Sequence, residues 1–325
     1  MSKLARCQKI QYVDSKGEPG DQEVFAYVEK EEDGFDQFLD EEEIDMENFV
    51  VPSQPECHIC MLPLPFDGGN ESLLKLQPCC GYVMCRACEE SSFYGALKRG
   101  IAWDKAQKCP FCNSEQVTSR QQFIAALNRL VERGNIDAMY NQAKYFFQGN
   151  GVPTDKRKGM ELLHVAARAG SYRACRHLAI LYFESDYNKA MRLFTRGAKL
   201  GDSICLYNVG MKRKAEDMND SVHYFLKSAS AGFQLALDEV KQFYLAEYIT
   251  KDEYARALRS FQSAHDKVKS EARTKFNKRL ADNQTMNDLS SMTITERLCA
   301  ITTVIRCDFP MRPDELVKVV RAFLF

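Results

Sequence analysis

The sequence predicts a mainly α-helical protein in which a small two-zinc module precedes an α-solenoid of helix-pair repeats. Three observations lead to this prediction. Eight of the 13 cysteines fall in four close pairs within residues 57–112. Glycines recur every 31 to 36 residues in the segment that follows them. Ahead of both, the first 56 residues carry a strong excess of acidic side chains.

The N-terminal segment, residues 1–55, is acidic enough to oppose its own folding. Residues 1–56 hold 16 acidic and 5 basic side chains, whereas the remaining 269 residues carry a net charge of +10. This imbalance predicts a largely disordered, solvated segment. Alternating residues at 10–13 and 23–28 allow a short hairpin, which alone is marginal in water. The alternative is a regulatory segment that folds back on the basic remainder or docks a basic partner.

The cysteine pairs have the spacing of metal ligands. They are Cys57 and Cys60, Cys79 and Cys80, Cys85 and Cys88, and Cys109 and Cys112. A C-x2-C turn offers two sulfurs to one ion, and eight thiolates satisfy two tetrahedral zinc ions. Gaps of 18 residues after Cys60 and 20 after Cys88 favour two ions shared between interleaved pairs. The alternatives are a reduced cysteine-rich loop region or disulfides.

Residues 57–112 resemble a RING finger in its all-cysteine variant, which places a module at residues 56–114. The resemblance rests on Cys57-His-Ile-Cys60, on Cys79-Cys-Gly-Tyr-Val-Met-Cys-Arg-Ala-Cys88, and on Cys109-Pro-Phe-Cys112. It implies a cross-brace in which the first and third pairs hold one zinc and the second and fourth pairs hold the other. Tyr82 stands where most RING fingers carry a histidine, and a phenol is a poor zinc ligand at neutral pH. The second site therefore takes the adjacent Cys79 and Cys80, and we expect His58 to be a surface residue.

The RING resemblance implies a ubiquitin-protein ligase. Such a module docks a charged ubiquitin-conjugating enzyme and acts by positioning it, without a covalent intermediate. The docking positions of the family correspond to Ile59, Trp103 and Pro110, although Trp103 could instead pack in the module's own core. Strong ligases carry an arginine after the last cysteine, where this chain has the uncharged Asn113. The alternative interpretation is a zinc-stabilised protein–protein interaction adaptor without ligase activity.

Residues 118–281 show the self-similarity of stacked helix pairs. Four glycines are each followed, four residues later, by a small side chain. These positions are Gly134 and Ala138, Gly170 and Ala174, Gly201 and Cys205, and Gly232 and Ala236. The first unit, from Ala138 to Gly170, resembles a Sel1-like repeat, a relative of the tetratricopeptide repeat. The resemblance implies a solenoid whose concave surface binds a substrate or scaffold protein.

Both ends of the array have recognisable helix signals. Ser119 with Gln122 predicts a capped first helix, joined to the zinc module with almost no linker. The segment that opens at Asp252 predicts a long helix running to about residue 280. Residues 283–325 predict a separate helical cap or tail, with Thr293 and Glu296 as a capping box.

The remaining features restrict the function further. No apolar run reaches the roughly 18 to 20 residues that a membrane span needs, and the first residues lack the apolar stretch of a secretory signal. An odd number of thiols predicts a reducing compartment, cytoplasm or nucleus. Basic clusters are assigned to solvated helix faces, and nucleic acid is not an expected partner. The sequence shows no phosphate loop and no nucleophile set, so two zinc ions are the expected cofactors.

Overall fold

The computed structural model describes residues 35, 39, 44–46, 48–65, 73–115, 117 and 119–280. The chain separates into two units, Met1–Lys269 and Ser270–Phe325. In the second unit, the described residues form a helix over 271–280. The hairpin expected within residues 10–28 and the tail expected at 283–325 lie outside the described residues.

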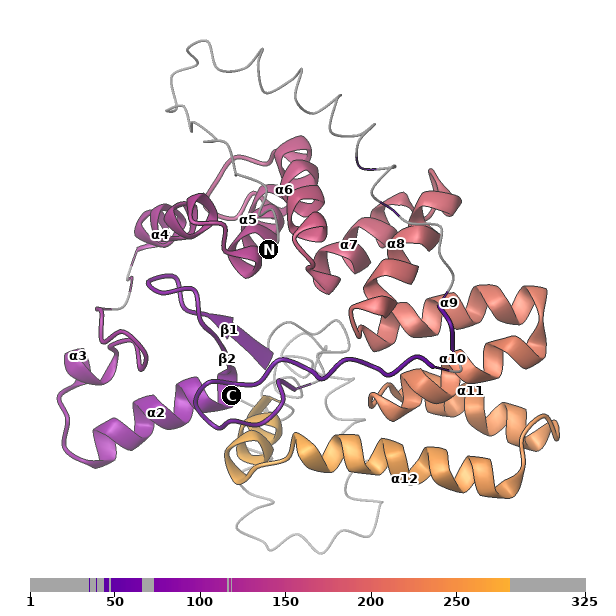
Figure 1. The fold of residues 1–325 in the computed structure, drawn as a ribbon. Coiled ribbons are helices and arrows are strands. Elements are labelled where there is room, and N and C mark those ends of the chain that lie inside the picture. Colours follow the sequence, from indigo (N-terminus) through magenta and orange to yellow (C-terminus); the bar gives the residue numbers. More distant parts are fainter. Residues whose placement is uncertain are drawn as a thin grey trace, which may run out of the picture. The chain divides into compact units, whose positions relative to one another are not determined.

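The cysteine-rich segment folds around one short hairpin and one helix (Figure 1). Strands β1 (Leu74–Leu76) and β2 (Val83–Cys85) pair antiparallel, with Leu74 opposite Cys85. Helix α2 (Arg86–Lys98) begins directly after β2, and the short α3 (Trp103–Ala106) follows it. The hairpin and the start of α2 thus fix the positions of Cys85 and Cys88 relative to each other.

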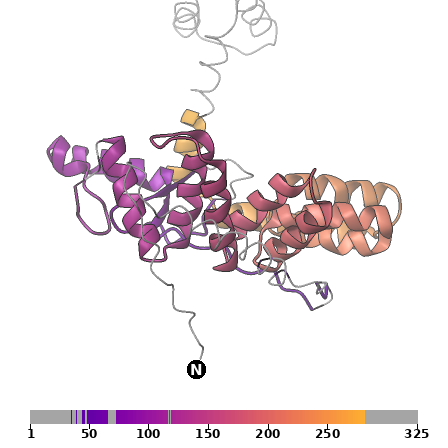
Figure 2. The same ribbon diagram turned by 90° about the horizontal axis from the view of Figure 1, so that it is seen from above.

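The helical array begins at α4 (Arg120–Glu132) and continues as antiparallel pairs that pack in sequence order (Figures 1 and 2). The pairs are α5 (Ile136–Gln148) with α6 (Lys156–Arg168), α7 (Tyr172–Tyr182) with α8 (Tyr187–Lys199), α9 (Ser203–Glu216) with α10 (Met218–Ser230), and α11 (Gln234–Leu245) with α12 (Lys251–Lys267). Each pair also packs on the next, through α6 with α7, α8 with α9 and α10 with α11. The mainly helical solenoid predicted from the glycine period is confirmed.

The repeating glycines and small residues have the roles that the sequence indicates. Each glycine takes a left-handed φ between 78° and 94° just after α4 or after the second helix of a pair, a conformation that costs other residues more. The four small residues that follow are fully buried; they are Ala138, Ala174, Cys205 and Ala236. A larger side chain there would separate the helices, so these positions set the close approach of successive pairs.

The long helix expected to reach residue 280 is interrupted, and that prediction is wrong. Helix α12 ends at Lys267, and Val268 is its C-cap. Ser270 then starts the helix of the second unit, because its side chain accepts a hydrogen bond from Arg273 N at 3.2 Å. A serine in that position favours a new helix start over helix continuation.

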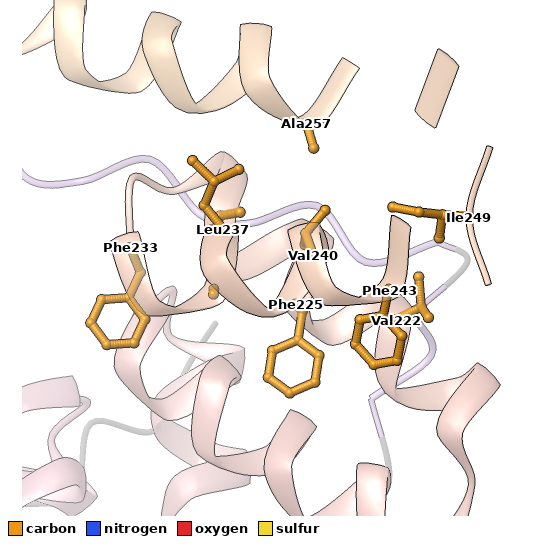
Figure 3. Close-up of a cluster of buried hydrophobic side chains, with 10 residues drawn as sticks. Val222, Phe225, Phe233, Leu237, Val240, Phe243, Ile249 and Ala257 are labelled. Atoms are coloured by element: carbon orange, nitrogen blue, oxygen red, sulfur yellow. The ribbon is translucent and has the colours of Figure 1, made fainter. Parts of the chain in front are cut away.

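The C-terminal end of the first unit has its own apolar core (Figure 3). Phe225 from α10 packs against Phe243 from α11, with ring centroids 5.7 Å apart. Phe233, Leu237 and Val240 fill the same cluster, which Ala257 of α12 covers. No helix within the described part of the chain is long and apolar enough to cross a membrane.

A buried ion pair links two successive helix pairs. Arg176 on α7 donates from Nη1 to Asp202 Oδ2 at 2.8 Å, and their side chains are 8% and 2% exposed. The other oxygen of Asp202 caps α9 by accepting from Cys205 N at 2.9 Å. One carboxylate therefore joins the start of α9 to the preceding pair.

We expect Asp202→Ala to destabilise the array by about 3 to 5 kcal/mol, because it removes the buried carboxylate that pairs with the Arg176 charge. Asp186 is a matched control, since it is exposed and caps α8 through Lys189 N at 2.9 Å. Asp186→Ala should cost only about 1 kcal/mol, the usual loss for a helix cap. Urea unfolding followed by circular dichroism measures both. Equal losses of unfolding free energy in the two variants would show that the Arg176–Asp202 pair adds nothing to the stability that the Asp202 helix cap provides.

Candidate metal centres

The structure brings the eight cysteines of residues 57–112 together in two sets of four. Within each set, the sulfur atoms all lie within 4.8 Å of one another. The sets are Cys57, Cys60, Cys85 and Cys88, and Cys79, Cys80, Cys109 and Cys112. This grouping joins the first pair to the third and the second to the fourth, the interleaved arrangement that the spacing favours. Both sets could hold a metal ion.

The sulfur separations in the second set fit a tetrahedral zinc ion. Cys80 Sγ lies 3.8 Å from Cys109 Sγ, and Cys79 Sγ lies 4.0 Å from Cys80 Sγ and 3.4 Å from Cys112 Sγ. Four sulfurs placed 2.3 Å from one zinc ion are separated by about 3.8 Å. Adjacent cysteines at 79 and 80 are therefore compatible with a single ion.

The first set is built on the hairpin and the start of α2. Cys57, Cys85 and Cys88 are buried. The backbone N–H of Cys85 donates to Cys57 Sγ at 3.4 Å, and hydrogen bonds from Cys85 and Cys88 lower the pKa of Cys57. Helix α2 starts at Arg86, so its positive dipole end faces this set and favours negative sulfur.

Protonation in the second set differs from one thiol to the next. Burial raises the pKa of Cys79, and burial also raises that of Cys80 to about 11. Cys112 is exposed, and its hydrogen bond with Ser114 lowers its pKa to about 6. A cation would offset the mutual repulsion of these sulfurs once they are thiolates.

Three cysteine turns end on a residue with a left-handed backbone. Met61, Gly81 and Asn113 each follow the second cysteine of a turn and have φ values of 55°, 79° and 56°. Asn113 N donates to Cys109 O at 2.9 Å, which closes the last turn. Asparagine tolerates this conformation better than most residues. The position where strong RING ligases carry arginine therefore has a structural role in this chain.

The docking positions implied by the RING resemblance are only partly described. Ile59 is 37% exposed, and Pro110 is also exposed. Trp103 is the first residue of α3, and its side chain lies outside the described residues. Two apolar side chains thus face solvent on neighbouring cysteine turns, and their role in docking stays a prediction.

A cluster of rings next to the metal sites was not predicted. His58 is exposed and lies 4.7 Å from the Tyr82 ring, and Tyr82 lies 5.1 Å from Phe111 (centroid distances). His58 comes from the first set's turn, whereas Tyr82 and Phe111 belong to turns of the second set. Each is within two residues of a clustered cysteine, and that proximity was the available signal. The rings join the two candidate metal centres on the surface.

The second cysteine set also contacts the helical array. Asn135 caps α5 through Ala138 N at 2.8 Å, and its Nδ2 donates to Gly81 O at 3.4 Å. A Cβ atom added at Gly81 would come within 2.6 Å of Asn135 Nδ2 and 3.2 Å of Leu130. Glycine is therefore required at residue 81 both by its backbone conformation and by this close contact.

The comparison with protein-family models identifies repeats within the array. The model of the Sel1 repeat matches residues 136–171, 173–202 and 205–233. No RING family model matches the chain. The chitin synthase regulator SKT5 of Saccharomyces cerevisiae is 29% identical over 176 residues, which cover 47% of this chain and 25% of that protein. The chain thus spans about a quarter of this relative.

Three solved structures show similarity at low TM-scores. A Sel1 repeat protein from Oxalobacter formigenes has a TM-score of 0.36 and 19% identity, covering 37% of this chain and 97% of its own. The protective antigen c5321 of uropathogenic Escherichia coli has a TM-score of 0.39 and 16% identity, covering 73% of this chain and 46% of its own. The immunity protein Pa5087 of Pseudomonas aeruginosa has a TM-score of 0.34 and 18% identity, covering 55% of this chain and 66% of its own. The family match, together with the observed helix pairs, shows that residues 136–233 are Sel1 repeats.

Proposed function

We propose that the chain is a protein–protein interaction adaptor in which the Sel1 repeats bind a partner and a zinc-stabilised module provides a second contact surface. The observation that carries this proposal is an apolar patch on the turn between α7 and α8. Ile180 is 60% exposed there, and Leu181, Phe183 and Tyr187 are also exposed. The rings of Phe183 and Tyr187 pack edge to face, 5.6 Å apart. Clustered exposed apolar groups of this kind mark interaction sites.

The relative supports a role exerted on another protein. It is described as a regulator of chitin synthase, and the similarity covers 47% of this chain. Within the described residues, the two cysteine sets are the only groups of three or more metal-ligating side chains that could hold an ion. Four cysteines close a zinc site and leave no open position for a substrate. Both features fit an adaptor better than a metalloenzyme.

We include two structural zinc ions in this proposal, held by the two cysteine sets. Bound zinc would supply folding free energy to residues 56–114, whose described part contains one short hairpin and the helices α2 and α3. The ten cysteines that the structure describes are all free thiols. We also propose a reducing compartment, the cytoplasm or nucleus, because the sequence contains an odd number of cysteines.

Removing one ligand of the first set should remove its zinc. We expect Cys57→Ala to lower bound zinc from two ions per chain to one or none, and to make residues 57–112 sensitive to protease, because structural zinc contributes on the order of 10 kcal/mol to folding. Metal analysis by mass spectrometry and limited proteolysis measure this. Cys175→Ala, a buried thiol on α7 outside both sets, should retain two ions. Two ions in Cys57→Ala would disprove the ligand assignment.

A ubiquitin-protein ligase is the second candidate. The interleaved grouping of the cysteines favours it, because this is the cross-brace that the RING resemblance implies. The exposed Ile59 also fits a docking position for a ubiquitin-conjugating enzyme. Against it, Asn113 offers no positive charge at the position that bridges enzyme and ubiquitin, and it serves the turn instead.

The adaptor proposal predicts no ubiquitin transfer by the purified chain. The test incubates the zinc-loaded full chain with ubiquitin, its activating enzyme and a panel of conjugating enzymes, and detects conjugates by immunoblot. Ile59→Ala is the matched variant. Conjugates that form with the unmodified chain and fall at least tenfold with Ile59→Ala would replace the adaptor with the ligase.

A further inference from the structure

The N-terminal acidic segment contributes a ring that is buried in the repeat array. The Phe35 side chain is fully buried, and its ring stacks on His164 of α6 with centroids 4.3 Å apart and planes 6° from parallel. Arg168 Cζ and Lys189 Nζ lie 5.5 Å and 5.9 Å from the same ring centroid. The ring is therefore surrounded by an imidazole and two cations, which attract the face of an aromatic ring.

The surface beneath Phe35 is organised by the repeats themselves. His164 Nε2 lies 3.1 Å from Tyr182 Oη of α7, and Lys189 Nζ lies 4.5 Å from the Tyr182 ring centroid. These side chains come from α6, α7 and α8, so two successive helix pairs build the surface. We call it the Phe35 site.

Further anchors follow Phe35 along the segment, which we call the acidic arm, residues 35–54. Leu39 N donates to Phe35 O at 3.2 Å, which places the buried Leu39 one helical turn later. Ile44 and Met46 are also buried. Four apolar side chains of this acid-rich stretch are thus removed from water.

The later part of the acidic arm crosses the next helix pair. Lys227 Nζ of α10 donates to Phe49 O at 2.6 Å, and Gln54 Nε2 donates to Gly201 O at 3.2 Å. A Cβ atom added at Gly201 would come within 3.2 Å of Pro52. With the Phe35 site, these contacts involve the second helices of three successive pairs, α6, α8 and α10.

Charge complements this packing. Residues 31–47 contain ten acidic side chains and no lysine or arginine. Three cations contact described residues of the acidic arm. Arg168 of α6 and Lys189 of α8 lie near the Phe35 ring, and Lys227 of α10 donates to the Phe49 carbonyl group. Opposite charges of this kind steer and orient a bound segment.

We propose that the Phe35 site is a docking site for acidic peptide segments with an aromatic residue followed four positions later by an aliphatic one, and that the acidic arm occupies it in competition with such a partner. This proposal rests on the adaptor function and names its partner class. The contacts described for the acidic arm are side-chain anchors and two side-chain hydrogen bonds to carbonyl groups, with no strand pairing to the array. A tethered segment acts at an effective concentration of about millimolar, so it raises the apparent Kd of a free competitor.

The test measures binding of a fluorescent peptide with the sequence of residues 31–49 to the full chain by fluorescence anisotropy. We expect the variant Phe35→Ala/Leu39→Ala, which releases the acidic arm, to bind the peptide at least tenfold more tightly than the unmodified chain. A peptide with alanine in place of its phenylalanine at the position of Phe35 should bind at least tenfold more weakly. Circular dichroism shows that the helices of the released variant are retained.

Charge reversal locates the site. In the released variant, Arg168→Glu should weaken binding at least tenfold, whereas Lys241→Glu, an exposed residue of α11, should leave it unchanged. Equal binding by the unmodified and released chains, no binding by either, or no effect of Arg168→Glu would overturn the proposal. A dimer of the unmodified chain that dissociates in the released variant would assign the site to a second copy and would also overturn it. None of these results depends on ubiquitin transfer, so the adaptor function is tested separately.

Discussion

The close approach of successive helix pairs is the constraint on which the rest of the structure depends. It requires a fully buried small residue four positions after each of the four repeating glycines, as at Ala174 and Cys205. Because successive pairs lie so close, a residue that caps one helix can also bind a neighbouring element. Asp202 caps α9 and binds Arg176 of α7, and Asn135 caps α5 and contacts the cysteine turn at Gly81. In both cases the residue that caps a helix also connects that helix to a neighbouring part of the protein.

The periodic part of the fold could be predicted because it depends on residue types that each serve one structural purpose at their position. A glycine with a left-handed φ and a small residue in a tight contact are specified locally, so Gly170 and Ala174 were identified without a structure. The end of α12 could not be predicted in this way, because Val268 and Ser270 stand in a helical pattern that continues beyond them. Only the hydrogen bond of Ser270 to the following backbone decides between one helix and two.

The candidate metal centres divide in the same way. Spacing alone favoured the interleaving of the four cysteine pairs, because a C-x2-C turn brings two sulfurs together whatever surrounds it. The ring cluster of His58, Tyr82 and Phe111 depends on how three separate turns meet, and no local pattern specifies that. Asn113 differs again: it stands at the position where strong RING ligases carry arginine, and the left-handed φ of its own turn explains why asparagine is found there.

The acidic arm illustrates why composition alone does not decide between a solvated and a docked segment. Its like charges oppose compaction of the arm by itself, but the same charges favour contact with a basic surface. The balance depends on apolar anchors, and Phe35, Leu39, Ile44 and Met46 are buried in the first unit. The fold-back alternative therefore describes these residues better than disorder does. A docked segment of this composition gains little stability from its own secondary structure, so its position depends on the side chains that it contacts. A partner with the same anchors would contact the same side chains.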